Sequence, residues 1–309
     1  NRMRRFYRCD EGFQPVDNSN EYHWIDILEP DSEETQYLEE ELKVPPMFME
    51  YLKDADERPR VEREGAWLMT IVLIPATDHV DGMPYKTVPC GIISCGSQPV
   101  ITLCYYKNRM MEDFADHTRH LGINVDNVPN FTLRVFFSAA SWYLRCLRNV
   151  ANIVLGQEKN IDKAIKNDEL IKLMRLQKSL VYFSTSIKGN LMVLERVCKM
   201  NEGNIDQDLA EDVQIELRQA DATASIYTEI LDGTMDSYAS IISNNVNSVM
   251  KRMSGISIIL IVPTFVASLF GMNVNILLGD VPYAFWIIIG IAAVLTVLAF
   301  LLLRRVKWF

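Results

Sequence analysis

Two long stretches without a charged residue, both near the carboxyl end, constrain this 309-residue chain more than any other feature. Residues 253–272 form a run of 20 residues, and residues 281–303 form a run of 23. A helix needs about 20 predominantly apolar residues to cross the roughly 30 Å hydrocarbon core of a bilayer. We therefore predict two transmembrane helices, 253–273 and 281–303, joined by a short outer loop, 274–280.

The basic residues around these stretches predict their orientation. Lys251 and Arg252 precede the first stretch, and the basic tail 304–309 follows the second. The connecting segment 273–280 contains neither Lys nor Arg. Because cytoplasmic flanks carry an excess of Lys and Arg, we expect both termini in the cytoplasm and the loop outside.

The charged residues are concentrated in the rest of the chain. The first 250 residues hold 39 of the 40 acidic and 26 of the 31 basic residues, which indicates an acidic soluble part attached to a membrane part. An acidic body does not suit nucleic acid, whereas it suits cations, although solubility alone would explain it equally well. The Gly-x-x-x-x-Gly-Lys-Ser/Thr motif is absent, so we expect no nucleotide. Without a nucleophile–base motif or a metal-hydrolase spacing, we do not expect an enzyme.

The cysteines and histidines give little indication of a metal site. None of the six cysteines forms a Cys-x-x-Cys pair, which argues against a zinc ribbon and fits a reducing cytoplasm. His117 and His120 could share a helix face, but we identify no carboxylate or cysteine ligand beside them. We therefore do not expect a metal centre there.

The first part of the chain reads as a mixed α/β domain, residues 1–128. Two short helices are expected, one capped by Asp31 after Pro30 and one following Pro45 and Pro46. Runs rich in β-branched and aromatic residues predict strands at 22–27, 67–74, 88–95 and 100–105.

Residues 129–252 read as helices that end in a long stalk. From Asp206 to Pro263 there is no proline before position 263, and glycine occurs only at 233 and 255. One unbroken helix over 206–272 would extend about 100 Å. We expect it to run from the cytoplasm into the membrane as the first transmembrane helix.

The two apolar stretches differ in polarity. Ser254, Ser257, Pro263, Thr264 and Ser268 interrupt the first, whereas the second is more uniformly apolar. Polar and small residues within a membrane usually face other helices or water, so the first helix is expected to lie inside. Two helices cannot enclose a pore, so transport would require a homo-oligomer. A plain hairpin anchor whose polar residues only pack is the alternative.

Small or polar residues recur at steps of three or four along one side of the long helix. Such a pattern suits a water-filled axis, although small polar residues also mediate helix contacts. The positions are Asp236, Ser240, Ser243, Asn247, Met250, Ser254, Ser257, Ile261, Thr264, Ser268 and Gly271.

The segment Gly271-Met272-Asn273 closes the first stretch. Glycine commonly ends helices, and helix carboxyl ends carry a partial negative charge of about half a unit. In a symmetric oligomer these ends and the Asn273 carbonyls would attract a cation through its hydration shell, which suits Mg²⁺. Pro263 cannot donate to the carbonyl of Ile259, so that oxygen could also face the pore.

The chain resembles the CorA-type magnesium transporters. Gly271-Met272-Asn273 matches the signature, the GMN motif, that ends the first of the family's two C-terminal spans. Further matching segments follow the family order over nearly the whole chain. They are Trp24-Ile25-Asp26 with Pro30, residues 58–62, residues 247–251 and the tail 304–309.

The resemblance implies a funnel-shaped homopentamer in a prokaryotic inner membrane, with an α/β cytoplasmic domain, a long helical stalk and two C-terminal transmembrane helices. Gly271, Met272 and Asn273 would form the selectivity filter. Met250 and Met253 would form a hydrophobic constriction, with interhelical packing as the alternative. The other pore-lining candidates are Asn247, Ser257, Ile261, Thr264, Ser268 and Asp236, the last of which could instead be a solvated stalk residue.

The family also senses cytoplasmic Mg²⁺ at acidic interfaces between subunits, which implies a regulatory metal site here. Asp212 matches one acidic sensor position. The expected acidic partner is replaced by Tyr51, so Glu50, Asp54 or Asp56 would have to substitute.

The outer loop leaves the transported ion open. Many magnesium-transporting members have a Met-Pro-Glu-Leu type loop, whereas Asp280 is the only acid in this loop. Potential-driven Mg²⁺ uptake is the leading hypothesis. A Zn²⁺, Co²⁺ or Ni²⁺ transporter of the same family, or a membrane-anchored scaffold without transport, are the alternatives.

Overall fold

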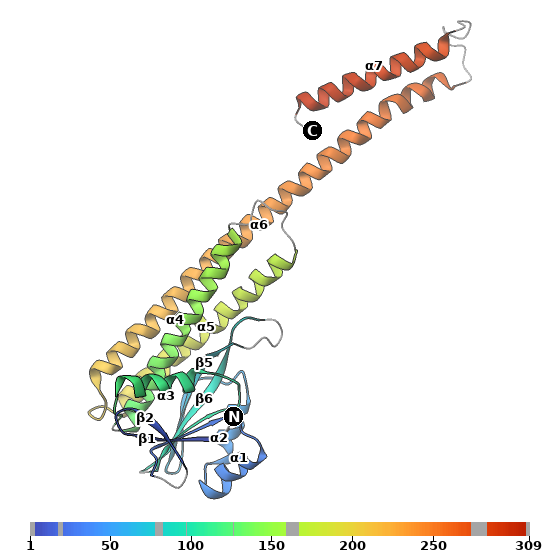
Figure 1. The fold of residues 1–309 in the computed structure, drawn as a ribbon. Coiled ribbons are helices and arrows are strands. Elements are labelled where there is room, and N and C mark those ends of the chain that lie inside the picture. Colours follow the sequence, from blue (N-terminus) through green and yellow to red (C-terminus); the bar gives the residue numbers. More distant parts are fainter. Residues whose placement is uncertain are drawn as a thin grey trace. The chain divides into compact units, whose positions relative to one another are not determined.

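The computed structural model describes most of the chain and divides into two units, Asn1–Met235 and Asp236–Phe309 (Figure 1). The described residues are 4–17, 21–77, 83–96, 98–125, 127–158, 167–272 and 283–306.

The first unit contains a mixed β-sheet. Among the described residues seven strands pair in the order β2-β1-β3-β7-β6-β5-β4. Only the pairing of β3 with β7 is parallel within this sheet. The strands are β1 (Arg4–Cys9), β2 (Phe13–Val16), β3 (Trp24–Leu28), β4 (Arg60–Glu64), β5 (Trp67–Ala76), β6 (Lys86–Cys95) and β7 (Val100–Cys104).

The four predicted strands are confirmed as β3, β5, β6 and β7, whereas β1, β2 and β4 were not predicted. β4 has the sequence Arg-Val-Glu-Arg-Glu, in which only Val61 is buried. Its strand conformation depends on antiparallel pairing with β5, from Arg60 opposite Ile71 to Glu64 opposite Trp67. This dependence on a partner strand explains why its own pattern gave no strand signal.

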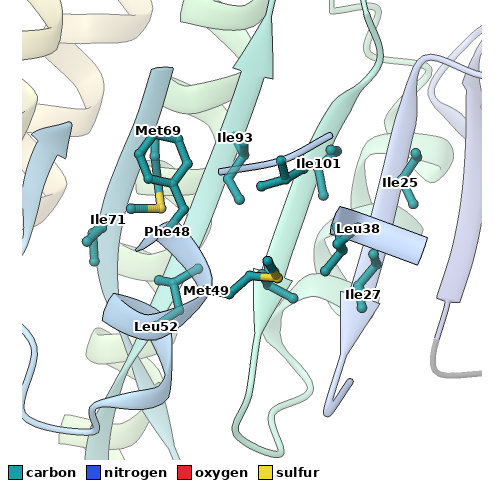
Figure 2. Packing of buried hydrophobic residues seen from close by; sticks show 12 residues of the cluster. Ile25, Ile27, Leu38, Phe48, Met49, Leu52, Met69, Ile71, Ile93 and Ile101 are labelled. Carbon is teal, nitrogen blue, oxygen red and sulfur yellow. The ribbon is translucent and has the colours of Figure 1, made fainter. Parts of the chain in front are cut away.

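Three short helices cover one face of the sheet: α1 (Ser32–Gln36), the π-helix η1 (Tyr37–Glu41) and α2 (Pro46–Lys53). The predicted cap is present, because the Asp31 carboxylate accepts hydrogen bonds from the amides of Glu33 and Glu34, both at 2.9 Å. Figure 2 shows Leu38, Phe48, Met49 and Leu52 from these helices packed against isoleucine and methionine side chains of the strands. All members of this cluster are at most 2% exposed, so it is the core of this layer.

Longer helices cover the opposite face: α3 (Met110–Leu121), α4 (Val128–Glu158) and α5 (Asn167–Met200). Trp24 is fully buried there, stacked on Tyr7 at 4.3 Å between ring centroids and in edge contact with Phe114 of α3. Asn190 of α5 binds both backbone groups of Leu73, accepting from its amide at 3.0 Å and donating to its carbonyl at 2.7 Å. The sequence predicted helices from Pro129 onward but missed α3.

A buried polar chain lies on this second face. The Trp24 indole donates to the Thr102 hydroxyl at 2.8 Å, and that hydroxyl donates to the Asp26 carboxylate at 2.7 Å. Asp26 is only 4% exposed, and its burial raises the pKa from an ordinary value of 3.8 to about 6. The carboxyl group is therefore easier to protonate in the folded chain than in the unfolded one.

The buried carboxyl predicts a specific pH dependence. Because the folded-state pKa is the higher one, the stabilisation from Asp26 is complete below about pH 4 and is lost as the pH rises to about 6, amounting to roughly 3 kcal/mol. Asp26→Asn removes this titration, so relative to the native chain it should gain that amount between pH 4 and pH 7. Urea unfolding of both proteins, with exposed Asp56→Asn as control, measures the difference. A difference that is constant with pH would contradict the assignment.

Two further helices complete the chain. α6 (Gln207–Phe270) is one continuous helix of 64 residues, which confirms the predicted long helix. In the first unit its buried positions recur at helical spacing, and Asp221 accepts a 3.1 Å hydrogen bond from Ser184 of α5. α7 (Ala284–Arg305) contains 22 residues, none of them buried. Within the described residues, α6 and α7 are the helices long and apolar enough to cross a membrane.

Candidate functional site

The pore-lining candidates lie on a single helix. All eight fall on α6 in the second unit, and every one is exposed in the single chain. Their spacings of three, four and eleven residues place them on one side of an α-helix, here named the candidate pore face. The candidate pore face comprises Asp236, Asn247, Met250, Met253, Ser257, Ile261, Thr264 and Ser268.

The opposite side of the same helix is more covered. Gly255 and Val266 are buried, and Ile259, Val262 and Pro263 are half-buried. On the candidate pore face, by contrast, Met250, Met253 and Ile261 are 61%, 63% and 61% exposed. Large apolar side chains left open in this way indicate a surface that another chain or the bilayer covers.

Two hydroxyl groups on the candidate pore face, those of Ser257 and Thr264, are turned back onto the helix. Ser257 donates to the carbonyl of Met253 at 3.0 Å, and Thr264 donates to the carbonyl of Leu260 at 2.8 Å. A hydroxyl has one proton to donate and two lone pairs to accept with. Because the proton is already used, the exposed oxygens of Ser257 and Thr264 offer acceptors, which suit a cation or its hydration water.

α6 continues through Pro263. Proline has no amide proton, so residue 263 cannot donate the usual helical hydrogen bond to the carbonyl of Ile259. Thr264 is the next residue, and its hydroxyl donates to the neighbouring carbonyl, that of Leu260. The Ile259 carbonyl thus lacks its usual helical donor, but Ile259 is half-buried on the more covered side of α6, so its facing the pore stays a prediction.

α6 ends where the Gly-Met-Asn segment begins. Its last helical residue is Phe270, and the amide of Gly271 still donates to the carbonyl of Ala267 at 2.9 Å. Gly271 is not among the described glycines with positive φ, so it does not end the helix by the left-handed conformation usual for glycine. A side chain there would come within 3.1 Å of the Ala267 carbonyl oxygen. Met272 is 56% exposed, whereas Asn273 and Asp280 lie outside the described residues.

The candidate sensor residues do not converge within one chain. Asp212 is exposed on α6, and Glu50 is exposed on α2 with its carboxylate 3.9 Å from the Lys53 amine. Tyr51 lies under the Arg60 guanidinium, 4.4 Å from its ring centroid. Asp54 caps the following turn by accepting from the Asp56 amide at 3.0 Å. No three His, Cys, Asp or Glu side chains of the described chain come together in a way that could hold a metal ion.

Sequence reasoning missed two neighbours of the histidine pair on α3. His117 and His120 line the same groove as Asp113 and Asp116, and the spacing 113-116-117-120 could have indicated this shared face. Asp113 is paired with Arg145 at 3.1 Å, and Asp116 is paired with Arg119. Both carboxylates are therefore already engaged in ion pairs with arginines.

Comparison with known proteins matches nearly the whole chain to one protein family. A family model described as CorA-like Mg²⁺ transporter protein matches residues 19–305. The chain is 23% identical over 305 residues to the cobalt/magnesium transport protein CorA of Methanocaldococcus jannaschii. That alignment covers 92% of the chain and 90% of the relative.

Three solved structures share the fold. The complete structure of the CorA magnesium transporter from Methanocaldococcus jannaschii matches with a TM-score of 0.82 and 20% identity, covering 100% of this chain and 99% of the other. The full-length CmaX protein matches with a TM-score of 0.66 and 14% identity, covering 98% and 97%. The ZntB cytoplasmic domain from Vibrio parahaemolyticus matches with a TM-score of 0.60 and 10% identity, covering 79% and 97%. At these identities the likeness establishes the fold, and it confirms the predicted α/β domain, long helix and two C-terminal helices.

Proposed function

The chain belongs to the family of CorA-like Mg²⁺ transporter proteins, and on that basis we propose that it carries Mg²⁺ across a membrane along the candidate pore face of α6. Transport is driven by the membrane potential. A divalent ion gains about 4.6 kcal/mol per 100 mV, twice the value for a single charge. The chain is a transporter and not an enzyme.

The acceptor character of the candidate pore face carries this proposal. The Ser257 and Thr264 hydroxyls donate their hydrogen bonds to carbonyls of their own helix, and both side chains are exposed. Neutral oxygens aligned along a helix can exchange hydrogen bonds with the water shell of a passing cation. Mg²⁺ sheds its waters reluctantly, so a path that leaves the shell in place suits this ion. Gly271, Met272 and Asn273 form the filter at the end of the path, and Met250 and Met253 form the constriction.

A homopentamer with five α6 helices around an axis supplies the enclosed path that one chain lacks. The exposed large side chains on the candidate pore face support this assembly. The organisation follows the sequence prediction: cytoplasmic α/β domain 1–128, cytoplasmic helices and stalk 129–252, spans 253–273 and 281–303, outer loop 274–280 and cytoplasmic tail 304–309. Both termini lie in the cytoplasm, and the membrane is a prokaryotic inner membrane.

Mg²⁺ is favoured over Zn²⁺ by the ligands along the path. The candidate pore face has no His or Cys, and Asp236 is its single acid. Zn²⁺ prefers nitrogen and sulfur ligands, whereas Mg²⁺ prefers oxygen. The relative's name adds Co²⁺ as a second cargo. Ni²⁺ and Zn²⁺ are the remaining alternatives.

Cytoplasmic Mg²⁺ closes the pore by binding at acidic surfaces between subunits. Asp212 is exposed on α6 and Glu50 on α2, so either can meet a neighbouring subunit. We expect Mg²⁺ to protect the native protein from protease and Asp212→Ala to lose this protection, while Asp208→Ala, one turn earlier, keeps it. Unchanged protection of Asp212→Ala would remove this residue from the sensor.

The direct test is ion uptake by proteoliposomes that contain the full chain, under an inside-negative potential set by a K⁺ gradient. We expect Mg²⁺ uptake that rises with the potential and also occurs with Co²⁺. Uptake of Zn²⁺ without Mg²⁺ would support the alternative ion, and no uptake of any divalent ion would support a membrane-anchored scaffold.

A further inference from the structure

A groove between α3 and α4, outside the candidate pore face, has the features of a ligand site. It has a volume of about 560 Å³, within the range of pockets that hold small molecules. Its walls include Phe137 and Trp142 of α4 and the two histidines of α3. The groove therefore combines aromatic surface with polar groups.

One wall of the groove is a row of hydrogen-bond donors on α4. Arg134, Ser138, Ser141 and Arg145 lie at spacings of four, three and four residues and all line the groove. These spacings bring the four side chains onto one side of the helix. A single ligand in the groove can therefore reach several of them.

Three of these donors have no acceptor among the described residues. Arg134 is half-buried, yet it forms no ion pair, side-chain hydrogen bond or ring contact there, and the same holds for the hydroxyls of Ser138 and Ser141. Arg145 differs, because it is held by Asp113 at 3.1 Å and stacks on Trp142 at 4.7 Å from the ring centroid. A half-buried guanidinium without an acceptor leaves hydrogen-bonding capacity unused.

The charged residues of the groove favour a negatively charged ligand. Asp113 and Asp116 are neutralised by Arg145 and Arg119, so the positive charge of Arg134 remains uncompensated among the described residues. A planar guanidinium binds carboxylates and phosphates through paired hydrogen bonds. We propose that this groove binds a small aromatic molecule bearing a phosphate or carboxylate, with the oxyanion on Arg134, Ser138 and Ser141 and the ring against Phe137 and Trp142.

The aromatic part of the ligand follows from the same geometry. The Arg145 guanidinium stacks on one side of the Trp142 ring, 4.7 Å from its centroid, which favours the ring orientation seen here. Rigid aromatic side chains provide contact area at a low cost in conformational entropy. Inorganic phosphate would use the donors but leave this apolar surface uncovered.

Calorimetric titration of the detergent-solubilised full chain in Mg²⁺-free buffer tests the proposal. The probes are 1-naphthyl phosphate and 1-naphthoate, with inorganic phosphate and 1-naphthol as comparisons. We expect saturable binding of one naphthyl anion per chain. Both comparison molecules should bind at least about tenfold more weakly, since inorganic phosphate lacks the aromatic ring and 1-naphthol lacks the anionic group. The stronger of the two anions identifies phosphate or carboxylate as the natural group.

Arg134→Gln should weaken binding of the preferred anion about tenfold or more, because a charge-assisted hydrogen bond is lost. Arg196→Gln, which removes an exposed arginine of α5 outside the groove, should leave binding unchanged. Ser138→Ala combined with Ser141→Ala should weaken it several-fold, and circular dichroism checks that each variant is folded. Equal affinity for 1-naphthol, unchanged affinity of Arg134→Gln, or no saturable binding of either anion would overturn the proposal.

Discussion

Replacing Asn273 by alanine is expected to reduce Mg²⁺ uptake by about 100-fold or more in proteoliposomes. A hydrogen bond to a charged group contributes about 1.5–3 kcal/mol, and each 1.4 kcal/mol changes a rate about tenfold. In a symmetric oligomer every subunit loses its side-chain carbonyl at the same ring. The residue closely follows Phe270, the last residue of α6, where the carbonyls of the last turn add to the negative potential.

Asn245→Ala is the matched control for this variant. Asn245 is exposed on α6 and lies two residues before Asn247, on the other side of the helix from the candidate pore face. We expect its uptake to remain close to that of the native chain. If Asn273→Ala kept more than half of the native uptake while its oligomer stayed intact, Asn273 would not be the filter.

The second large effect is expected at the two methionines. Met250→Ser combined with Met253→Ser should increase Mg²⁺ leak by about tenfold or more at the high internal Mg²⁺ that we propose closes the native pore. A ring of apolar side chains blocks ions by excluding water, and serine hydroxyls would let water remain. Both methionines are more than half exposed in the single chain, so the substitution opens no cavity within it. Mg²⁺ influx into preloaded proteoliposomes measures the leak.

Ile256→Ser provides the comparison for the methionine variant. Ile256 is 47% exposed and lies between the methionine turn and Ile259, away from the candidate pore face. It should leave the leak unchanged. A leak that is the same in the native and the Met250/Met253 double variant would show that these side chains only pack between helices.

The membrane part of the fold could be predicted because its determinants are local. The absence of charge over 20 and 23 residues, and the absence of proline from 206 to 262, are sufficient for two spans and one long helix. The expected first span reached residue 273, whereas α6 ends at Phe270. Gly271 marked the position of this end correctly, although its backbone is not left-handed as the usual glycine cap would be.

The missed elements depend on partners far away in the sequence. β1 and β2 carry arginines and a proline, and β1 is held between β2 and β3 in the sheet. α3 is rich in charged residues, and its helical stripe of Met110, Met111, Phe114 and Thr118 is buried only because the sheet and α4 cover it. Such tertiary context outweighs local propensity.

In the candidate site, too, some features follow from local sequence and others depend on the folded structure. The spacing along α6 predicted which residues share a face, because helical periodicity alone determines it. The direction of the Ser257 and Thr264 hydroxyls, by contrast, depends on hydrogen bonds to backbone carbonyls, which the spacing of residue types does not reveal. The replacement of a sensor acid by Tyr51 was visible in the sequence, but its stacking under Arg60 was not.

The claim that one face of α6 lines a water-filled cation path is tested most directly by cysteine accessibility. Ser257→Cys, Thr264→Cys and Val262→Cys are made singly in a chain whose six native cysteines are replaced, and each is treated with a cationic methanethiosulfonate during Mg²⁺ uptake. Cysteines at 257 and 264 should react and block uptake, because a positive charge in the path repels Mg²⁺. A cysteine at 262, on the covered side, should leave uptake unchanged. Equal block from position 262, or no block from 257 and 264, would contradict the path.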